Sequence, residues 1–116
     1  MEEIKVGEYV RTKQGKIRQL KSIVAQYYIT DRLHINDNNQ FKIEDIIKHS
    51  PNIIDLIEVG DYVNGERVID IAQGEIKAIY TENIEQKLAL IPKTNKDIKS
   101  IVTKQQMEAM EYKVGE

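Results

Sequence analysis

Short segments of alternating apolar and polar residues, separated by turn residues, run along most of this chain. Alternation with a period of two is typical of strands that bury one face. In the first half it predicts strands over 17–24, 27–30 and 41–50, a hairpin loop at 13–15 and one helical turn at 44–45. In the second half it predicts strands over 58–63, 66–72, 75–80, 87–91 and 97–102, and an edge strand over 112–114.

The density of strands predicts the fold class. Several short strands within residues 1–50 are typical of a small SH3-like β-barrel. Ser50 followed by Pro51 then predicts a single helical turn over 52–56, because serine caps a helix and proline fits its first position. Residues 51–116 are expected to form a β-rich unit with a short α-helix at about 103–111. The fold is therefore predicted to be mostly β, in two parts that are joined too closely for a flexible linker and can share one core.

The C-terminal helix is predicted from its start and from one apolar face. Thr103 and Gln106 have the spacing of a capping box, in which each side chain bonds the other residue's backbone N–H. Met107 and Met110 lie three residues apart and so share a face of the helix. Such a pair is most often core packing, and we expect both methionines to cover the second sheet.

One phrase occurs twice in the chain. Residues 4–10 (IKVGEYV) are echoed by residues 57–63 (IEVGDYV), 53 residues later, with five of the seven positions identical. Each copy is followed by a glycine turn, and Asn64-Gly65 is a strong signal for a two-residue hairpin of type I′. Both halves are thus predicted to begin with a β-hairpin, through internal duplication or through one local solution used twice.

Composition limits the classes of protein to consider. The chain has 116 residues, no cysteine and a net charge of −2, so disulfides, thiolate metal sites and thiol catalysis are excluded. No apolar run approaches the ~18 residues that a membrane span needs, and the acidic start does not resemble a signal peptide. We therefore expect a soluble protein of the cytoplasm, without contact to a membrane.

Residue patterns of catalysis are missing from the sequence. The two histidines, His34 and His49, have no nearby ligand cluster for zinc. His49 and Ser50 are adjacent on a predicted strand and so point to opposite faces, which is unsuited to a base and its nucleophile. The glycines are spaced as turns rather than as a phosphate-binding loop. We expect no enzyme, no metal and no cofactor.

Charge divides the chain into three parts and marks two candidate binding surfaces. Residues 1–43 carry a balance of +3, residues 44–85 of −7 and residues 86–116 of +2. A basic run followed by two tyrosines suits phosphate contacts and base stacking, although one tyrosine of the adjacent pair is expected in the core. This set is Arg11, Lys13, Lys16, Arg18, Lys21, Tyr27 and Tyr28. The alternative is an acidic surface that meets a basic protein groove, with Glu44, Asp45, Asp55, Glu58 and Asp61.

Two segments carry a resemblance. Residues 52–65 (NIIDLIEVGDYVNG) and 100–108 (SIVTKQQME) resemble a group of small phage and prophage proteins of low-GC Gram-positive bacteria. The resemblance supplies no catalytic residue. It implies an accessory phage gene, and genes of this kind often encode inhibitors of host defence.

These observations lead to three hypotheses for the function. The leading hypothesis is a non-enzymatic phage anti-defence protein, acting in the host-cell cytoplasm, that blocks a CRISPR effector or a nucleotide immune signal. The second is a nucleic-acid-binding accessory barrel in phage replication or regulation, and the third is a structural phage protein. Expected partners are a host defence protein, its nucleic acid or a nucleotide signal. A second copy of the chain is also considered, because short barrels pair exposed edges.

Overall fold

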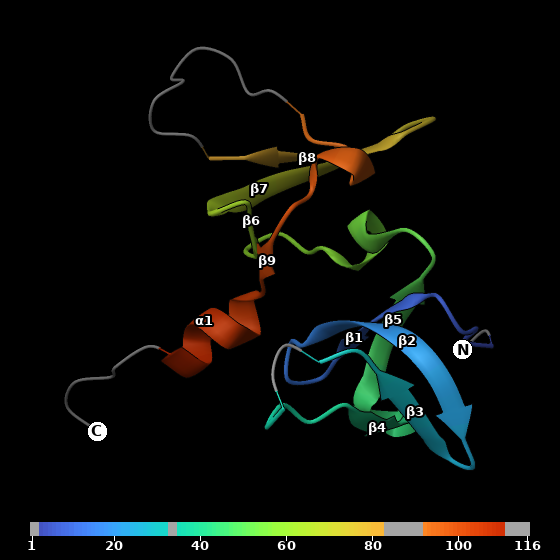
Figure 1. The fold of residues 1–116 in the computed structure, drawn as a ribbon. Coiled ribbons are helices and arrows are strands. Elements are labelled where there is room, and N and C mark those ends of the chain that lie inside the picture. The colour runs from blue at the N-terminus through green and yellow to red at the C-terminus, as the bar shows by residue number, and fades with distance from the viewer. Residues whose placement is uncertain (1–2, 33–34, 83–91, 111–116) are drawn as a thin grey trace. The chain divides into compact units, whose positions relative to one another are not determined.

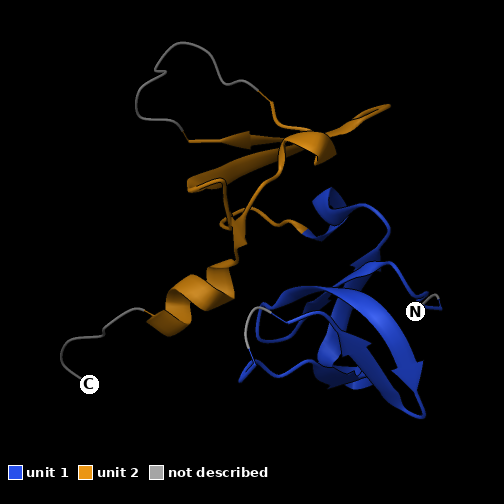
Figure 2. Cartoon of the chain, viewed as in Figure 1, with its two compact units in different colours: residues 1–56 blue, residues 57–116 orange. Residues whose placement is uncertain are grey.

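The structure is a computed structural model that describes residues 3–32, 35–82 and 92–110. The chain divides into two compact units, Met1–Leu56 (unit 1) and Ile57–Glu116 (unit 2), which Figure 2 shows in different colours. Each unit is built around one antiparallel sheet, and one short α-helix follows near the C-terminal end of the described residues. The expected mostly β fold class is confirmed, whereas SH3-like closure of unit 1 stays a prediction.

Unit 1 contains a five-stranded sheet with the strand order β4-β3-β2-β1-β5 (Figure 1). Its strands are β1 (Tyr9–Thr12), β2 (Ile17–Val24), β3 (Tyr27–Thr30), β4 (Gln40–Lys42) and β5 (Ile46–Ser50). Two 3-10 helices, η1 (Ile43–Asp45) and η2 (Ile53–Leu56), precede and follow β5. The expected strand over 41–50 is thus two strands, because η1 interrupts it where the helical turn is predicted.

The core of unit 1 lies on one face of this sheet. Val10, Leu20 and Phe41 are at most 4% exposed, and the ring of Tyr28 packs against them. Tyr27 points to the opposite face and is 36% exposed. This confirms that one tyrosine of the pair belongs to the core, as the alternation along a strand requires.

Unit 2 contains a four-stranded sheet with the order β8-β7-β6-β9. Its elements are β6 (Tyr62–Val63), β7 (Glu66–Gln73), β8 (Lys77–Thr81), the 3-10 helix η3 (Asn95–Asp97), β9 (Ile101–Val102) and α1 (Lys104–Met110). An isolated bridge from Lys93 to Ile79 lies beside β8. The apolar side chains of Val63, Val68 and Ile79 are fully buried.

Two predicted strands of unit 2 are shorter in the structure. The strand expected over 58–63 begins only at Tyr62, because residues 58–61 form a turn that Asp61 closes through the backbone N–H of Glu58. The strand expected over 97–102 is reduced to Ile101–Val102, because η3 takes its first residue. The strands expected over 87–91 and 112–114 lie outside the described residues.

The hairpin turn at Asn64-Gly65 is confirmed. Both residues have positive φ, 53° and 82°, and Val63 pairs with Glu66 across the turn. The side chain of Asn64 also accepts hydrogen bonds from the N–H groups of Lys99 and Ser100, at 2.8 and 3.0 Å. The turn therefore joins β6 to β7 and holds the chain that leads into β9.

We expect Gly65→Val to destabilise the protein by more than about 1 kcal/mol, because a β-branched residue disfavours positive φ. A Cβ at Gly65 would have no atom within 4 Å, so the loss would come from the backbone alone. Gly74→Val is the matched control, since Gly74 has no positive φ and an added Cβ would lie 3.9 Å from its nearest neighbour. Urea unfolding of both variants measures the difference, and equal midpoints would contradict the expected turn strain.

The repeated phrase adopts the same structure in both units. Gly7 and Gly60 have φ of 97° and 100°. Their N–H groups donate to the carbonyls of Leu20 and Val68, both at 2.9 Å. In each unit the next two strands follow in the same order, and a 3-10 helix precedes the strand that pairs with the first one. The shared order extends beyond the phrase, which favours duplication of a whole unit over a local coincidence.

Candidate functional site

The basic run is largely engaged within unit 1. Arg11 is fully buried, and its Nη1 donates to the carbonyl of Leu56 at 2.9 Å. Arg18 is 7% exposed and its Nη2 lies 2.9 Å from Asp37 Oδ2. Lys16 Nζ lies 3.3 Å from the other oxygen of Asp37. The run therefore finds its acidic partner about twenty residues away, in the loop between β3 and β4.

The remaining members of the set do not gather around these arginines. Lys13 and Lys21 are exposed, and Lys21 Nζ donates to Gln19 Oε1 at 2.8 Å. Tyr28 is in the core, whereas Tyr27 pairs with Val24 and Lys42 on the opposite face of the sheet. The structure does not bring the seven residues together as one basic and aromatic surface.

The acidic set is also divided. Glu44 and Asp45 belong to η1 of unit 1, where Asp45 caps the backbone of Lys42 at 3.1 Å. Asp55 accepts a hydrogen bond from Ser50 Oγ at 2.6 Å. Glu58 and Asp61 belong to unit 2 and are the pair that the structure brings together.

Asp61 is a buried anchor rather than a surface acid. Its two oxygens accept the N–H groups of Glu58 at 2.7 Å and of Lys104 at 2.9 Å, and the residue is fully buried. Glu58 Oε1 also lies 2.8 Å from Lys104 Nζ. The carboxylates of this corner therefore attach the turn at 58–61 to the first residue of α1.

The position of α1 overturns one expectation. The capping box is confirmed, since Thr103 N–H donates to Gln106 Oε1 at 3.0 Å and Gln106 N–H donates to Thr103 Oγ1 at 3.3 Å. The two methionines, however, are exposed: Met107 to 38% and Met110 to 75%. Polar contacts fix the start of the helix, which then leads away from the sheet of unit 2 (Figure 1). The prediction that Met107 and Met110 cover this sheet is wrong.

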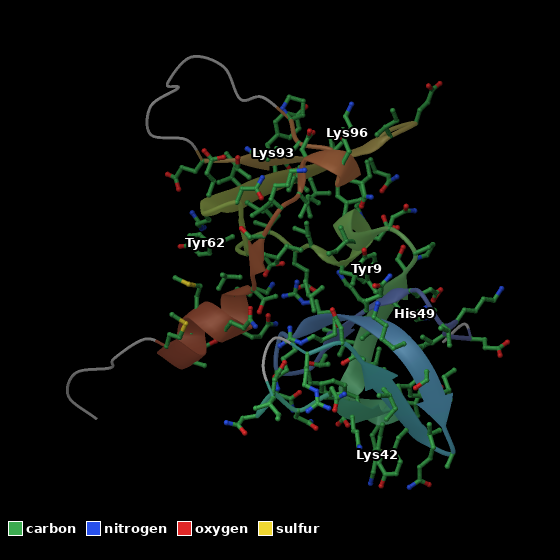
Figure 3. The ribbon with its side chains drawn as sticks, viewed as in Figure 1. Tyr9, Lys42, His49, Tyr62, Lys93 and Lys96 are labelled. Atoms are coloured by element: carbon green, nitrogen blue, oxygen red, sulfur yellow. The ribbon has the colours of Figure 1, made fainter. Side chains whose placement is uncertain are left out.

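An open groove of about 500 Å³ lies between this helix and the start of β6. Gly60, Tyr62, Lys104, Met107, Glu108 and Met110 line it. Tyr62 faces the groove because its neighbour Val63 occupies the core side of the strand. Figure 3 shows Tyr62 on the side of unit 2 that carries the sulfur atoms of α1. Every lining residue belongs to unit 2.

Unit 1 has different neighbours at the corresponding place. Tyr9 is the counterpart of Tyr62, and there η2 packs against β1 and β5. The guanidinium of Arg11 bonds the last residue of η2. In unit 2 the counterpart of Arg11 is Asn64, which stands in the hairpin turn and bonds the backbone at 97–100. The residues at these equivalent positions therefore have different partners in the two units.

The side chains of His49 and Ser50 in unit 1 contact different acidic residues. His49 Nδ1 lies 2.7 Å from Glu8 Oε1, and Ser50 Oγ donates to Asp55. His34 lies outside the described residues. Among residues 3–32, 35–82 and 92–110, no three histidine or acidic side chains are placed to hold a metal ion.

A polar cluster in unit 2 links β7 and β8 to the bridge residue Lys93. Lys93 Nζ lies 2.6 Å from Glu66 Oε1 and 2.7 Å from Thr81 Oγ1. Thr81 Oγ1 also donates to Glu66 Oε1 at 2.8 Å. The hydrogen bond from Lys93, followed by that from Thr81, lowers the pKa of Glu66 below its ordinary 4.5. The cluster holds the segment of Lys93 against β7 and β8.

We expect Lys93→Met to lower the stability of the protein at neutral pH, by at most about 1 kcal/mol for a partly exposed pair. A carboxyl with a lowered folded-state pKa stabilises the fold above its ordinary pKa of 4.5. That contribution is lost as the pH falls through the lowered value. The difference in unfolding free energy between wild type and variant should therefore become smaller in acid. Urea midpoints at about pH 7 and about pH 3 measure it, with Lys13→Met at an exposed position as control. An equal difference at both pH values would show that Glu66 does not stabilise the fold through Lys93.

Comparison with protein families, curated proteins and solved structures finds no match to this chain. The resemblance to small phage proteins therefore stays a hypothesis. Within the described residues, no helix has the length and apolar character needed to cross a membrane. The geometry of the groove is accordingly the main basis for a functional proposal.

Proposed function

We propose that the protein is a non-enzymatic phage anti-defence protein that blocks a host immune component in the host-cell cytoplasm. In this proposal an N-terminal SH3-like barrel is followed by a C-terminal β-rich unit, and the protein holds its target through the groove of unit 2. The observation that carries this proposal is the open groove of unit 2, which is lined by two exposed methionines. An exposed apolar cleft of this size is typical of a binding site.

Protein contact is favoured over capture of a nucleotide. The two arginines of the basic run are used inside unit 1, with Arg11 on a carbonyl and Arg18 on Asp37. The groove carries one lysine, whose Nζ already lies 2.8 Å from Glu58. A CRISPR effector, which exposes basic surfaces to nucleic acid, suits an acidic rim better than an anionic signal does.

Phage infection of cells that produce the protein tests the proposal. We expect the efficiency of plaquing to rise in strains with a CRISPR or nucleotide-signalling defence and to stay unchanged in isogenic strains without one. Equal plaquing in every pair of strains would reject the anti-defence role. Nucleotide recovered from the denatured protein after incubation with an immune signal would instead support signal capture.

One observation favours the second candidate, a nucleic-acid-binding barrel. Tyr27 is exposed and pairs with Lys42 of β4, which places an aromatic ring beside a cation on one sheet face. Such a pair suits stacking on single-stranded bases. If this function holds, fluorescence anisotropy should show binding of a single-stranded oligonucleotide that weakens steeply with salt and is lost in Tyr27→Ala. Tyr80→Ala on β8 is the control, and absence of binding at low salt would exclude this candidate.

A further inference from the structure

The groove of unit 2 combines an apolar floor with a charged rim. Tyr62, Met107 and Met110 supply the apolar surface, and methionine side chains adapt to irregular apolar partners. The two methionines are 38% and 75% exposed, which is unusual for large apolar side chains on adjacent turns of one helix. This surface is suited to receive apolar side chains from another molecule.

The charges around the groove are predominantly negative. Glu108 lines the groove, and Glu58 lies at its edge through its ion pair with Lys104. The buried carboxylate of Asp61 lies behind them, bonded to the N–H of Lys104. Among the described residues that line or border the groove, the carboxylates outnumber the single ammonium group of Lys104, and an excess of negative charge attracts cationic partners.

We propose that the groove binds a basic amphipathic segment of a partner protein, with apolar side chains on Tyr62 and the methionines and lysine or arginine beside Glu108 and Glu58. This inference rests on the proposed function for the biological identity of the partner. Apolar anchors give such a contact its affinity, while opposite charges give it orientation and rate. A second copy of this chain is a poorer occupant, because it would bring another negative rim to the groove.

A designed peptide tests the charge and the apolar face together. The probe is a fluorescein-labelled amphipathic helix of about 14 residues, with leucine at i, i+3, i+4 and i+7 and lysine elsewhere. Fluorescence anisotropy should show saturable binding to the full chain. A version with glutamate in place of lysine, and one with serine in place of leucine, should each bind at least about tenfold more weakly.

Variants of the exposed rim and floor locate the site. Met107→Gln combined with Met110→Gln should weaken binding of the lysine peptide about tenfold or more, as expected for the loss of apolar anchors. Glu108→Lys should weaken it several-fold, and more so at low salt. The matched controls are Ile76→Gln and Glu75→Lys, because both residues are exposed at the turn between β7 and β8. Unchanged far-UV circular dichroism shows that the variants fold.

The outcomes separate this inference from the proposed function. Failure of the wild type to bind, equal binding of the glutamate peptide, or equal losses in the controls would overturn the inference. A dimer in light scattering that the methionine variant abolishes would assign the groove to a second copy and would also overturn it. If peptide binding behaves as expected but plaquing is unaffected in all strains, the groove assignment stands and the anti-defence role falls.

Discussion

Replacing Arg11 by glutamate is expected to unfold unit 1. The side chain is fully buried, and its Nη1 donates to the carbonyl of Leu56 at 2.9 Å. Glutamate would remove that donor and place an uncompensated carboxylate beside a carbonyl oxygen. An unpaired buried charge costs several kcal/mol, about as much as a small domain has to lose. Circular dichroism should show a loss of β-sheet signal and a lower temperature of thermal unfolding.

Two further variants separate charge from volume. Arg11→Met keeps much of the apolar stem and should cost about 1–3 kcal/mol, because a buried carbonyl loses its donor. Lys13→Glu reverses a charge two residues away at an exposed position and should stay within about 0.5 kcal/mol of wild type. If Arg11→Glu melts like wild type, Arg11 is not a structural residue and the basic run becomes a candidate binding surface again.

The burial of Arg11 also changes how the basic run can be tested for binding. Reversal of Arg11, Lys16 and Arg18 together would confuse lost binding with lost folding, because both arginines are buried. Lys13 and Lys21 are exposed, so Lys13→Glu with Lys21→Glu changes the surface charge and leaves the buried contacts intact. This double variant is the appropriate probe of phosphate binding by unit 1.

Features governed by neighbours in sequence could be predicted. The hairpin at Asn64-Gly65 follows from the φ values that a tight turn requires. The capping box from Thr103 to Gln106 spans three residues, and the structure contains both of its hydrogen bonds. The period of two also placed the strands over 17–24 and 27–30 correctly, because Leu20 and Tyr28 of these strands pack into one core cluster.

Features governed by distant contacts could not be predicted. The sequence around Arg18 shows no acidic partner, because its partner Asp37 lies nineteen residues later in a loop. Met107 and Met110 form an apolar face, but a periodicity does not state what covers that face. The groove brings Tyr62 to a helix more than forty residues later. The missing information in each case is which segments the fold places side by side.

Asp61→Ala is expected to destabilise unit 2 by about 3 kcal/mol, because it removes the acceptor of two backbone N–H groups. These groups, on Glu58 and Lys104, lie 2.7 and 2.9 Å from the carboxylate in a fully buried position. Asp61→Asn should cost less, since the amide oxygen still accepts one of the two hydrogen bonds. Urea unfolding measures both changes, and Asp70→Ala, at an exposed position of β7, is the control.

The same substitution should disturb the groove before it unfolds the unit. Asp61 holds the turn at 58–61 against the first residue of α1, and that contact sets the spacing between Tyr62 and Met107. We therefore expect Asp61→Asn, under conditions where it remains folded, to weaken binding of the lysine peptide, whereas Asp70→Ala should bind like wild type. Full peptide affinity in a destabilised Asp61→Asn would mean that the helix keeps its place without the carboxylate. The Glu58–Lys104 ion pair, 2.8 Å long, would then be the contact that positions α1.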